Sequence, residues 1–144
     1  MPDITRKDRL RMLEQTLERA AEQVGDITGP TMQAFYEAYP DAVAAFERLA
    51  LGDRPYLEAR MVENCLYFMM EWYGRPGEVR GIIEDTVPHH RHTLEVPPEW
   101  YWGMLDAALG VVAHSIPADA AEERQVWNEM HEDLRAEIAE AGSW

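Results

Sequence analysis

The chain is built from amphipathic segments with helical periodicity, separated by short breaks rich in proline and glycine. Leu10, Leu13, Leu17, Ala21 and Val24 recur at spacings of three and four residues and form one apolar stripe. No stretch alternates cleanly between apolar and polar residues, as a half-buried strand would, and valine, isoleucine and threonine are sparse. The pattern therefore predicts an all-α protein.

The breaks divide the chain into six or seven expected helices within one domain that covers residues 1–144. Thr5 with Asp8, and Asp119 with Glu122, resemble capping boxes at the starts of the first and last helices. Pro88 is expected to kink or divide the helix in which it lies. The expected helices cover about residues 5–24, 30–39, 41–49, 54–73, 78–92, 98–116 and 119–141.

Charge and composition exclude several classes of function. The chain carries 13 Lys and Arg residues against 27 Asp and Glu residues, a net charge of −14. Such a field repels phosphate backbones and anionic bilayers, so neither nucleic acid nor a membrane surface is an expected partner. The longest uncharged stretch, residues 107–118, is too short to span a bilayer, and the first 20 residues show no secretory signal. With a single cysteine, Cys65, a cytoplasmic location is the simplest expectation.

The histidines are concentrated late in the chain, where His89, His90 and His92 surround Arg91. One interpretation is a solvated helix end, where imidazolium is favoured by the helix dipole. Another is a haem site, because a single histidine can hold haem iron through one axial bond. A zinc site is not favoured, since no partner stands at a recognisable ligand spacing. Cys65 lies in an apolar segment, which indicates a buried core residue rather than a catalytic thiol.

Three groups of residues resemble globins. Tyr39-Pro40-Asp41, followed by Phe46, resembles the end of the second globin helix and the phenylalanine that packs on the haem. His90, followed by Val96-Pro97 and Pro98-Glu99-Trp100-Tyr101, resembles the proximal histidine and the start of the next helix. Trp127, His131 and Leu134 resemble part of the last helix of bacterial single-domain globins, with His131 in place of a tyrosine. The chain is thus similar to the globin superfamily, and specifically to a bacterial single-domain haemoglobin.

This resemblance implies a globin-like fold of six to eight helices around haem b, iron protoporphyrin IX. His90 would be the iron ligand, with His92 as the alternative in a shifted register; the flavohaemoglobin register itself falls on Arg91. Phe46 would pack on the porphyrin face, and Val96 and Met104 would line the proximal side.

On the distal side the resemblance predicts an apolar pocket lined by methionine. Met32 falls where bacterial globins often place a tyrosine, and Met61, or Leu57 one turn earlier, would face the iron. Methionine supplies no hydrogen-bond donor, so CO and NO should bind readily while O2 is held loosely and the iron oxidises quickly. The nearby polar alternatives are Gln33, Tyr36, Tyr56, Arg60 and Asn64.

Two functions remain open at this point, besides an unrelated helical bundle. The first is a haem protein that binds a diatomic gas (O2, NO or CO) and relies on a separate reductase or signalling partner for redox turnover or output. The second is a haem-free globin-fold module for regulation or protein interaction, which a cavity sealed by side chains would indicate. No nucleophile–base pair supports an enzyme. Trp102 and Trp144 are candidates for a homodimer interface.

Overall fold

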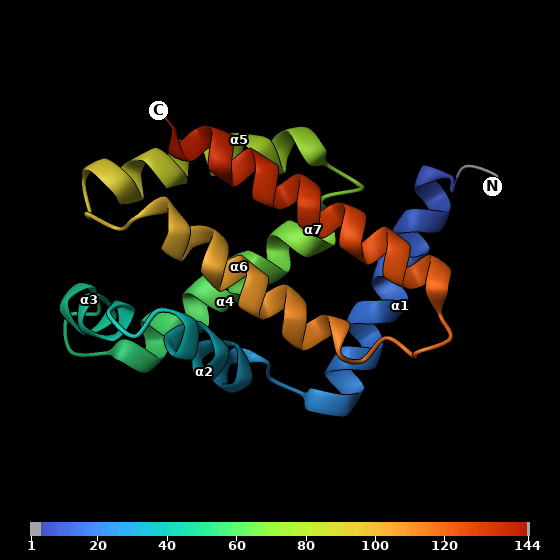
Figure 1. The fold of residues 1–144 in the computed structure, drawn as a ribbon, viewed down its shortest axis with the longest axis horizontal. Helices are drawn as coiled ribbons and strands as arrows, with labels where there is room; N and C mark the ends of the chain where they lie inside the picture. The colour runs from blue at the N-terminus through green and yellow to red at the C-terminus, as the bar shows by residue number, and fades with distance from the viewer. Residues whose placement is uncertain (1–3, 144) are drawn as a thin grey trace.

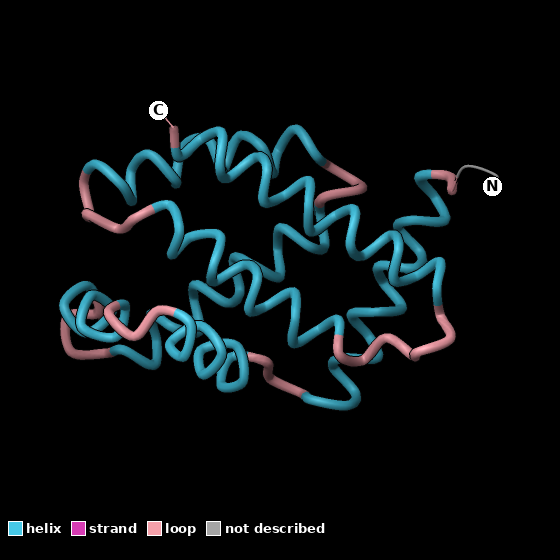
Figure 2. Tube along the Cα trace, in the orientation of Figure 1, coloured by secondary structure: helices cyan, strands magenta, loops and turns pink. Residues whose placement is uncertain are grey.

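A computed structural model describes residues 4–143 of the chain, and this part is all-α (Figures 1 and 2). It contains seven helices and no strand, which confirms the fold class predicted from the sequence. The helices are α1 (Arg6–Val24), α2 (Thr28–Ala38), α3 (Ala42–Leu49), α4 (Arg54–Glu71), α5 (Pro76–His92), α6 (Pro98–Ala113) and α7 (Ala121–Gly142).

Helices α6 and α7 form the centre of the packing. The long α7 contacts α5, α6 and α1, while α6 also contacts α2 and α4 (Figure 1). Helix α1 stands across one end of the molecule, and α2 and α3 lie at the other end, below α5 and α6 in Figure 1. Leu105, Leu109, Met130, Leu134 and Ile138 are almost completely buried between these layers. Their burial supplies the hydrophobic driving force that holds α6 and α7 together.

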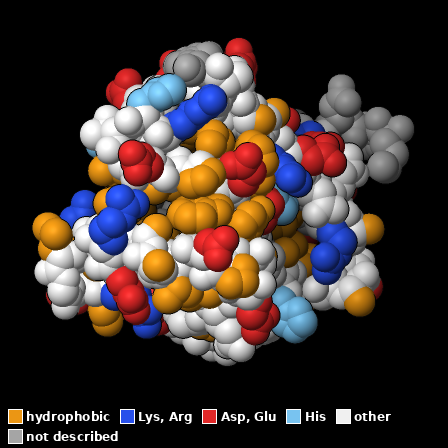
Figure 3. Space-filling view, turned by 60° about the vertical axis from the view of Figure 1, so that its left-hand side comes forward, with side chains coloured by type: hydrophobic (Ala, Val, Ile, Leu, Met, Phe, Trp, Pro, Cys, Tyr) orange, Lys and Arg blue, Asp and Glu red, His pale blue; other side chains and the backbone are white. Residues whose placement is uncertain are grey.

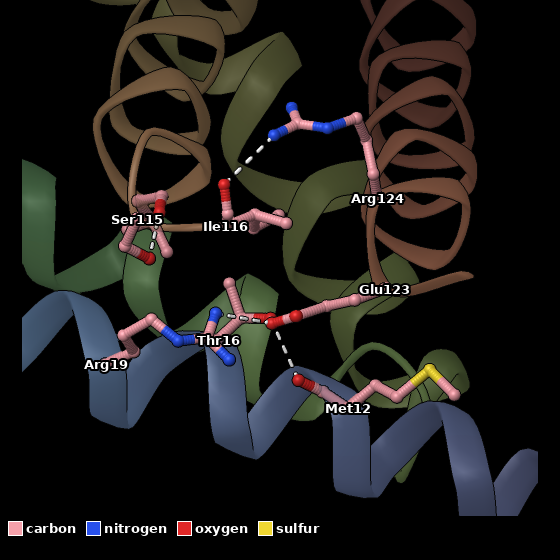
Figure 4. A network of polar contacts seen from close by, with 8 residues as sticks. Met12, Thr16, Arg19, Ser115, Ile116, Glu123 and Arg124 are labelled. Carbon is pink, nitrogen blue, oxygen red and sulfur yellow. Dashed lines mark hydrogen bonds and ion pairs between the residues drawn. The ribbon is translucent and has the colours of Figure 1, made fainter. Parts of the chain in front are cut away.

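The ends of the helices show which local signals operate. Thr5 caps α1 by accepting a hydrogen bond from the Asp8 backbone N–H at 3.1 Å, as its capping-box pattern predicts. The second predicted capping box is wrong, because the N-cap of α7 is Ala120 and makes no side-chain hydrogen bond. The Glu123 carboxylate in that first turn instead reaches α1, where Thr16 and Arg19 donate to it (Figure 4). These contacts join the first turn of α7 to α1.

Several boundaries differ by two or three residues from the sequence expectation, and α6 ends at Ala113 rather than at residue 116. Helix α2 begins at Thr28 rather than Pro30, and α5 begins at Pro76 rather than Glu78. Pro88 does not divide α5, which continues through it to His92. The histidine cluster therefore forms the last turn of a continuous helix.

Helix α1 buries a different face from the one that its apolar stripe predicts. Of the stripe, only Leu13 is fully buried, and Val24 is 42% exposed. Thr16 and Ala20 are buried instead, because α1 turns the face at positions 13, 16 and 20 toward α6 and α7. Leu10, Leu17 and Ala21 of the stripe lie beside α4, in a groove described below.

No helix within residues 4–143 is long and apolar enough to cross a membrane.

Candidate functional site

A cavity of about 520 Å³ lies between α2, α3, α4, α5 and α6. Its volume falls within the range of about 300–1,000 Å³ typical of cofactor and ligand sites. Figure 3 brings this end of the molecule forward, and hydrophobic side chains gather at the centre of the face with charged groups around them. The apolar part of the lining consists of Phe35, Phe46, Leu49, Leu57, Met61, Cys65, Phe68, Ile82, Leu94, Val96, Trp100, Met104 and Leu105.

His90 enters the cavity wall from the last turn of α5. Its Nδ1 lies 2.7 Å from the Thr86 carbonyl oxygen, one helical turn earlier. A carbonyl only accepts hydrogen bonds, so Nδ1 carries the proton and the lone pair of the neutral ring lies on Nε2. Burial lowers the pKa of His90 below its usual value of 6.5, which favours this neutral form. The imidazole is therefore held in the tautomer that offers Nε2 to a metal.

Thr86 also joins the histidine to a buried tyrosine. The Thr86 hydroxyl donates to the Ile82 carbonyl at 2.8 Å, which leaves its oxygen to accept from the Tyr101 hydroxyl at 2.7 Å. The Tyr101 ring meets His90 edge to face, with 5.3 Å between the ring centroids. Burial raises the pKa of Tyr101 to about 12, so its hydroxyl stays protonated. The His90 ring is thus fixed by a hydrogen bond and by an aromatic contact.

Helix α4 supplies a second wall of the cavity. Its lining residues recur at positions 57, 61, 64, 65 and 68, a spacing that places them on one helical face. Burial raises the pKa of the Cys65 thiol to about 12, so the side chain is a neutral thiol and a poor nucleophile. This agrees with the core role expected for Cys65. Among these five α4 residues, only the exposed Asn64 carries a strong hydrogen-bond donor.

Six of the seven predicted site residues line this one cavity: Phe46, Leu57, Met61, His90, Val96 and Met104. The exception is Met32, which is 4% exposed and packs in the core without lining the cavity. Phe35, one turn later on α2, lines it instead and packs on Phe46 with 5.8 Å between ring centroids. The larger ring reaches the cavity from the end of α2 that is nearer to α3.

The cavity distinguishes the three clustered histidines. His90 is part-buried and His89 is exposed, and both line the cavity, whereas His92 is exposed and does not. The charge of His89 further lowers the pKa of His90. Of His90, Arg91 and His92, only His90 lines the cavity.

Sequence reasoning missed several lining residues, notably Phe35, Phe68 and Thr86. The signal for Thr86 was available, because residue i−4 of a helix lies directly below residue i and can offer its carbonyl to a histidine side chain. The signal for Phe35 and Phe68 was weaker, since an aromatic residue at helical spacing is equally consistent with plain core.

The other residues that carry the globin resemblance have structural roles. The Trp127 indole donates to the Leu109 carbonyl at 3.2 Å, His131 pairs with Asp106, and Leu134 is fully buried. Trp102 is half-buried, with the Arg135 guanidinium 5.5 Å from its ring centroid. Trp144, the other candidate for a homodimer interface, lies outside the described residues.

Within residues 4–143, no group of three or more His, Cys, Asp or Glu side chains is placed to hold a metal ion. A metal beside His90 would therefore take most of its ligands from a group that is not part of the protein.

Comparison with known proteins found no match: no protein-family model, no curated protein and no solved structure is similar to this chain.

Proposed function

We propose that this chain is a globin-like protein that binds haem b through His90 and takes up a diatomic gas (O2, NO or CO) at the iron. The main support is the position of His90 in the wall of an apolar cavity, with Nδ1 bound to the Thr86 carbonyl and the lone pair left on Nε2. A hydrogen bond from the second ring nitrogen is the usual way in which proteins orient a metal-binding histidine.

The residues present fit a haem group. The cavity is large enough for a cofactor, its lining is mainly apolar, and it offers one neutral imidazole rather than a cluster of protein ligands. Bound haem would supply the iron that takes up the gas, and His90 would hold it. Phe46, Val96 and Met104 would exclude water from the porphyrin faces. A cavity sealed by side chains would have favoured the haem-free module, and the volume of about 520 Å³ supports haem binding instead.

The gas would meet a weakly polar environment. Leu57 and Met61 carry no hydrogen-bond donor, and the Cys65 thiol is only a weak one. The Asn64 amide is exposed at the edge of the cavity. We expect CO and NO to bind readily and O2 to be held loosely, because little stabilises negative charge on a bound ligand. A tight O2 complex that oxidises slowly would contradict this part of the proposal.

Haem titration of the purified protein tests the proposal. We expect a Soret band that saturates at one haem per chain and is lost in His90→Ala. His92→Ala is the matched control, because His92 belongs to the same exposed turn but does not line the cavity. Absence of a saturable band in the unmutated protein would refute haem binding. Loss of the band in His92→Ala alone would refute the assignment of His90.

A further inference from the structure

A second hollow lies on the far side of α4, between that helix and α1. It has a volume of about 600 Å³, and its apolar floor includes Leu10, Leu17, Leu66 and Met70. We refer to it as the α1–α4 groove. It shares α4 with the cavity that contains His90, but the two are lined by different residues.

Three residues of the α1 stripe, Leu10, Leu17 and Ala21, line this groove and keep part of their surface open to solvent. Leu10 and Leu17 are half-buried, and Ala21 is exposed. Met70 on the opposite wall is 54% exposed. An amphipathic helix whose apolar stripe faces an open groove has the form of a docking surface, since contiguous exposed apolar patches commonly mark interaction sites.

The groove is bordered by negative charge. Glu14 and Glu18 line it from α1, and Glu71 lines it from α4. Within residues 4–143, no hydrogen bond or ion pair engages the carboxylates of Glu14 and Glu18. Arg75, the one cation in the lining, lies 3.5 Å from Glu71 and equally close to Glu78, so these acids offset its charge. The α1 border therefore presents two available carboxylates above an apolar floor.

We propose that the α1–α4 groove binds a basic amphipathic helix of a partner protein. The stripe residues in the groove, from Leu10 to Ala21, span about 16 Å at 1.5 Å per residue, so about three turns of a partner helix would cover them. Apolar side chains of that helix would pack on Leu17 and Leu66, and its Lys or Arg residues would meet Glu14 and Glu18.

A second copy of this chain is a poor occupant. Each copy carries a net charge of −14, and two acidic grooves placed face to face would repel each other. A small apolar ligand would leave the bordering carboxylates unused. The proposal does not depend on haem, because no residue of the groove lines the His90 cavity.

Two 18-residue helical peptides test the proposal. Both carry the same leucine stripe, and the polar face is lysine in one and glutamate in the other. We expect the lysine peptide to bind one per chain in fluorescence anisotropy, and to perturb amide NMR signals of α1 and the end of α4. The glutamate peptide should bind at least tenfold more weakly. Equal binding of the two peptides, or perturbations elsewhere in the chain, would overturn the proposal.

Charge reversal separates the groove from general attraction to an acidic protein. Glu14→Lys/Glu18→Lys should weaken binding of the lysine peptide at least tenfold. Glu22→Lys/Glu132→Lys changes the net charge by the same amount at exposed sites outside the groove, and should weaken it less than threefold. Equal weakening by the two double variants would refute a specific site.

Met70→Lys is an independent variant at an exposed position, which places a cation within the groove. It should block the lysine peptide while the circular dichroism spectrum stays that of the folded protein. Unchanged affinity in folded Met70→Lys would contradict docking in this groove. Sedimentation and NMR would detect dimers that form through α1. Such dimers would show that a second copy occupies the groove, and would overturn the proposal.

Discussion

Replacing Glu123 by alanine should destabilise the fold more than replacing any other acidic residue of α7. Glu123 is 9% exposed and accepts hydrogen bonds from the Thr16 hydroxyl at 2.6 Å and from Arg19 at 2.8 Å (Figure 4). These contacts join the first turn of α7 to the middle of α1. The same Thr16 oxygen lies 2.9 Å from the Met12 carbonyl, so its single proton can satisfy either acceptor.

The size of the effect follows from these partners. Without Glu123, Thr16 can still donate to the Met12 carbonyl and is not left unpaired. The main loss is the charge-assisted bond from Arg19, for which about 1.5–3 kcal/mol is typical. Glu123 also stands in the first turn of α7, where a carboxylate interacts favourably with the helix dipole by about 0.3–1 kcal/mol. The expected loss in the free energy of unfolding is therefore about 2–4 kcal/mol.

Urea denaturation and thermal melting measure this loss. For a chain of this size the melting temperature should fall by about 6–12 °C. Glu132→Ala is the matched control, an exposed acidic residue of the same helix, and should change stability by no more than about 0.5 kcal/mol. A double-mutant cycle with Arg19→Ala should give a coupling of at least about 0.5 kcal/mol. Equal effects of Glu123→Ala and Glu132→Ala, or additive effects of the Arg19 and Glu123 variants, would refute the reasoning.

Three further predictions concern packing, backbone strain and pH. A Cβ at Gly103 would lie 2.4 Å from a ring carbon of Tyr39, so Gly103→Ala should lower the free energy of unfolding by about 1–3 kcal/mol. When Tyr39 is already alanine, adding Gly103→Ala should cost much less. Leu51 has a φ of 50° and is 93% exposed, so Leu51→Asn should raise the free energy of unfolding by about 1 kcal/mol, whereas Leu51→Ala should not. Burial lowers the pKa of His90 below its usual value of 6.5. As the pH falls below 6.5, this histidine takes up a proton in the unfolded chain while it stays neutral in the folded one. The haem-free protein should therefore lose stability relative to His90→Phe from pH 6.5 down to that lowered pKa, and parallel pH profiles in urea denaturation would contradict the titration of His90.

The helices and most of their ends could be predicted from the sequence because the interactions that form a helix are local. The Thr5 cap depends on the backbone N–H three residues away, and helical spacing alone predicts the apolar face of α4 that carries Leu57 and Met61. The capping box expected at Asp119 and Glu122 did not form, because α7 begins one residue later, with Ala120 as its N-cap.

Part of the candidate site could also be predicted from the sequence. The resemblance to globins pointed to His90 and to five of the apolar lining residues, but it placed Met32 where the structure has Phe35. Both residues lie on the same side of α2, and a sequence pattern cannot tell which turn of a helix lies beside a cavity. The Tyr101–Thr86 hydrogen bond was equally invisible, because it joins two helices whose relative position depends on packing.

Sequence alone determined the all-α class and the order of the helices, since each depends on residues a few positions apart. Tertiary structure alone decided which side chains meet across helices. It placed His90 in the wall of a cavity lined by residues from five helices, and it left part of the α1 stripe open beside α4. The physical reason is that helix periodicity sets the direction of a side chain, whereas close packing between helices decides whether that direction leads to core, cavity or solvent.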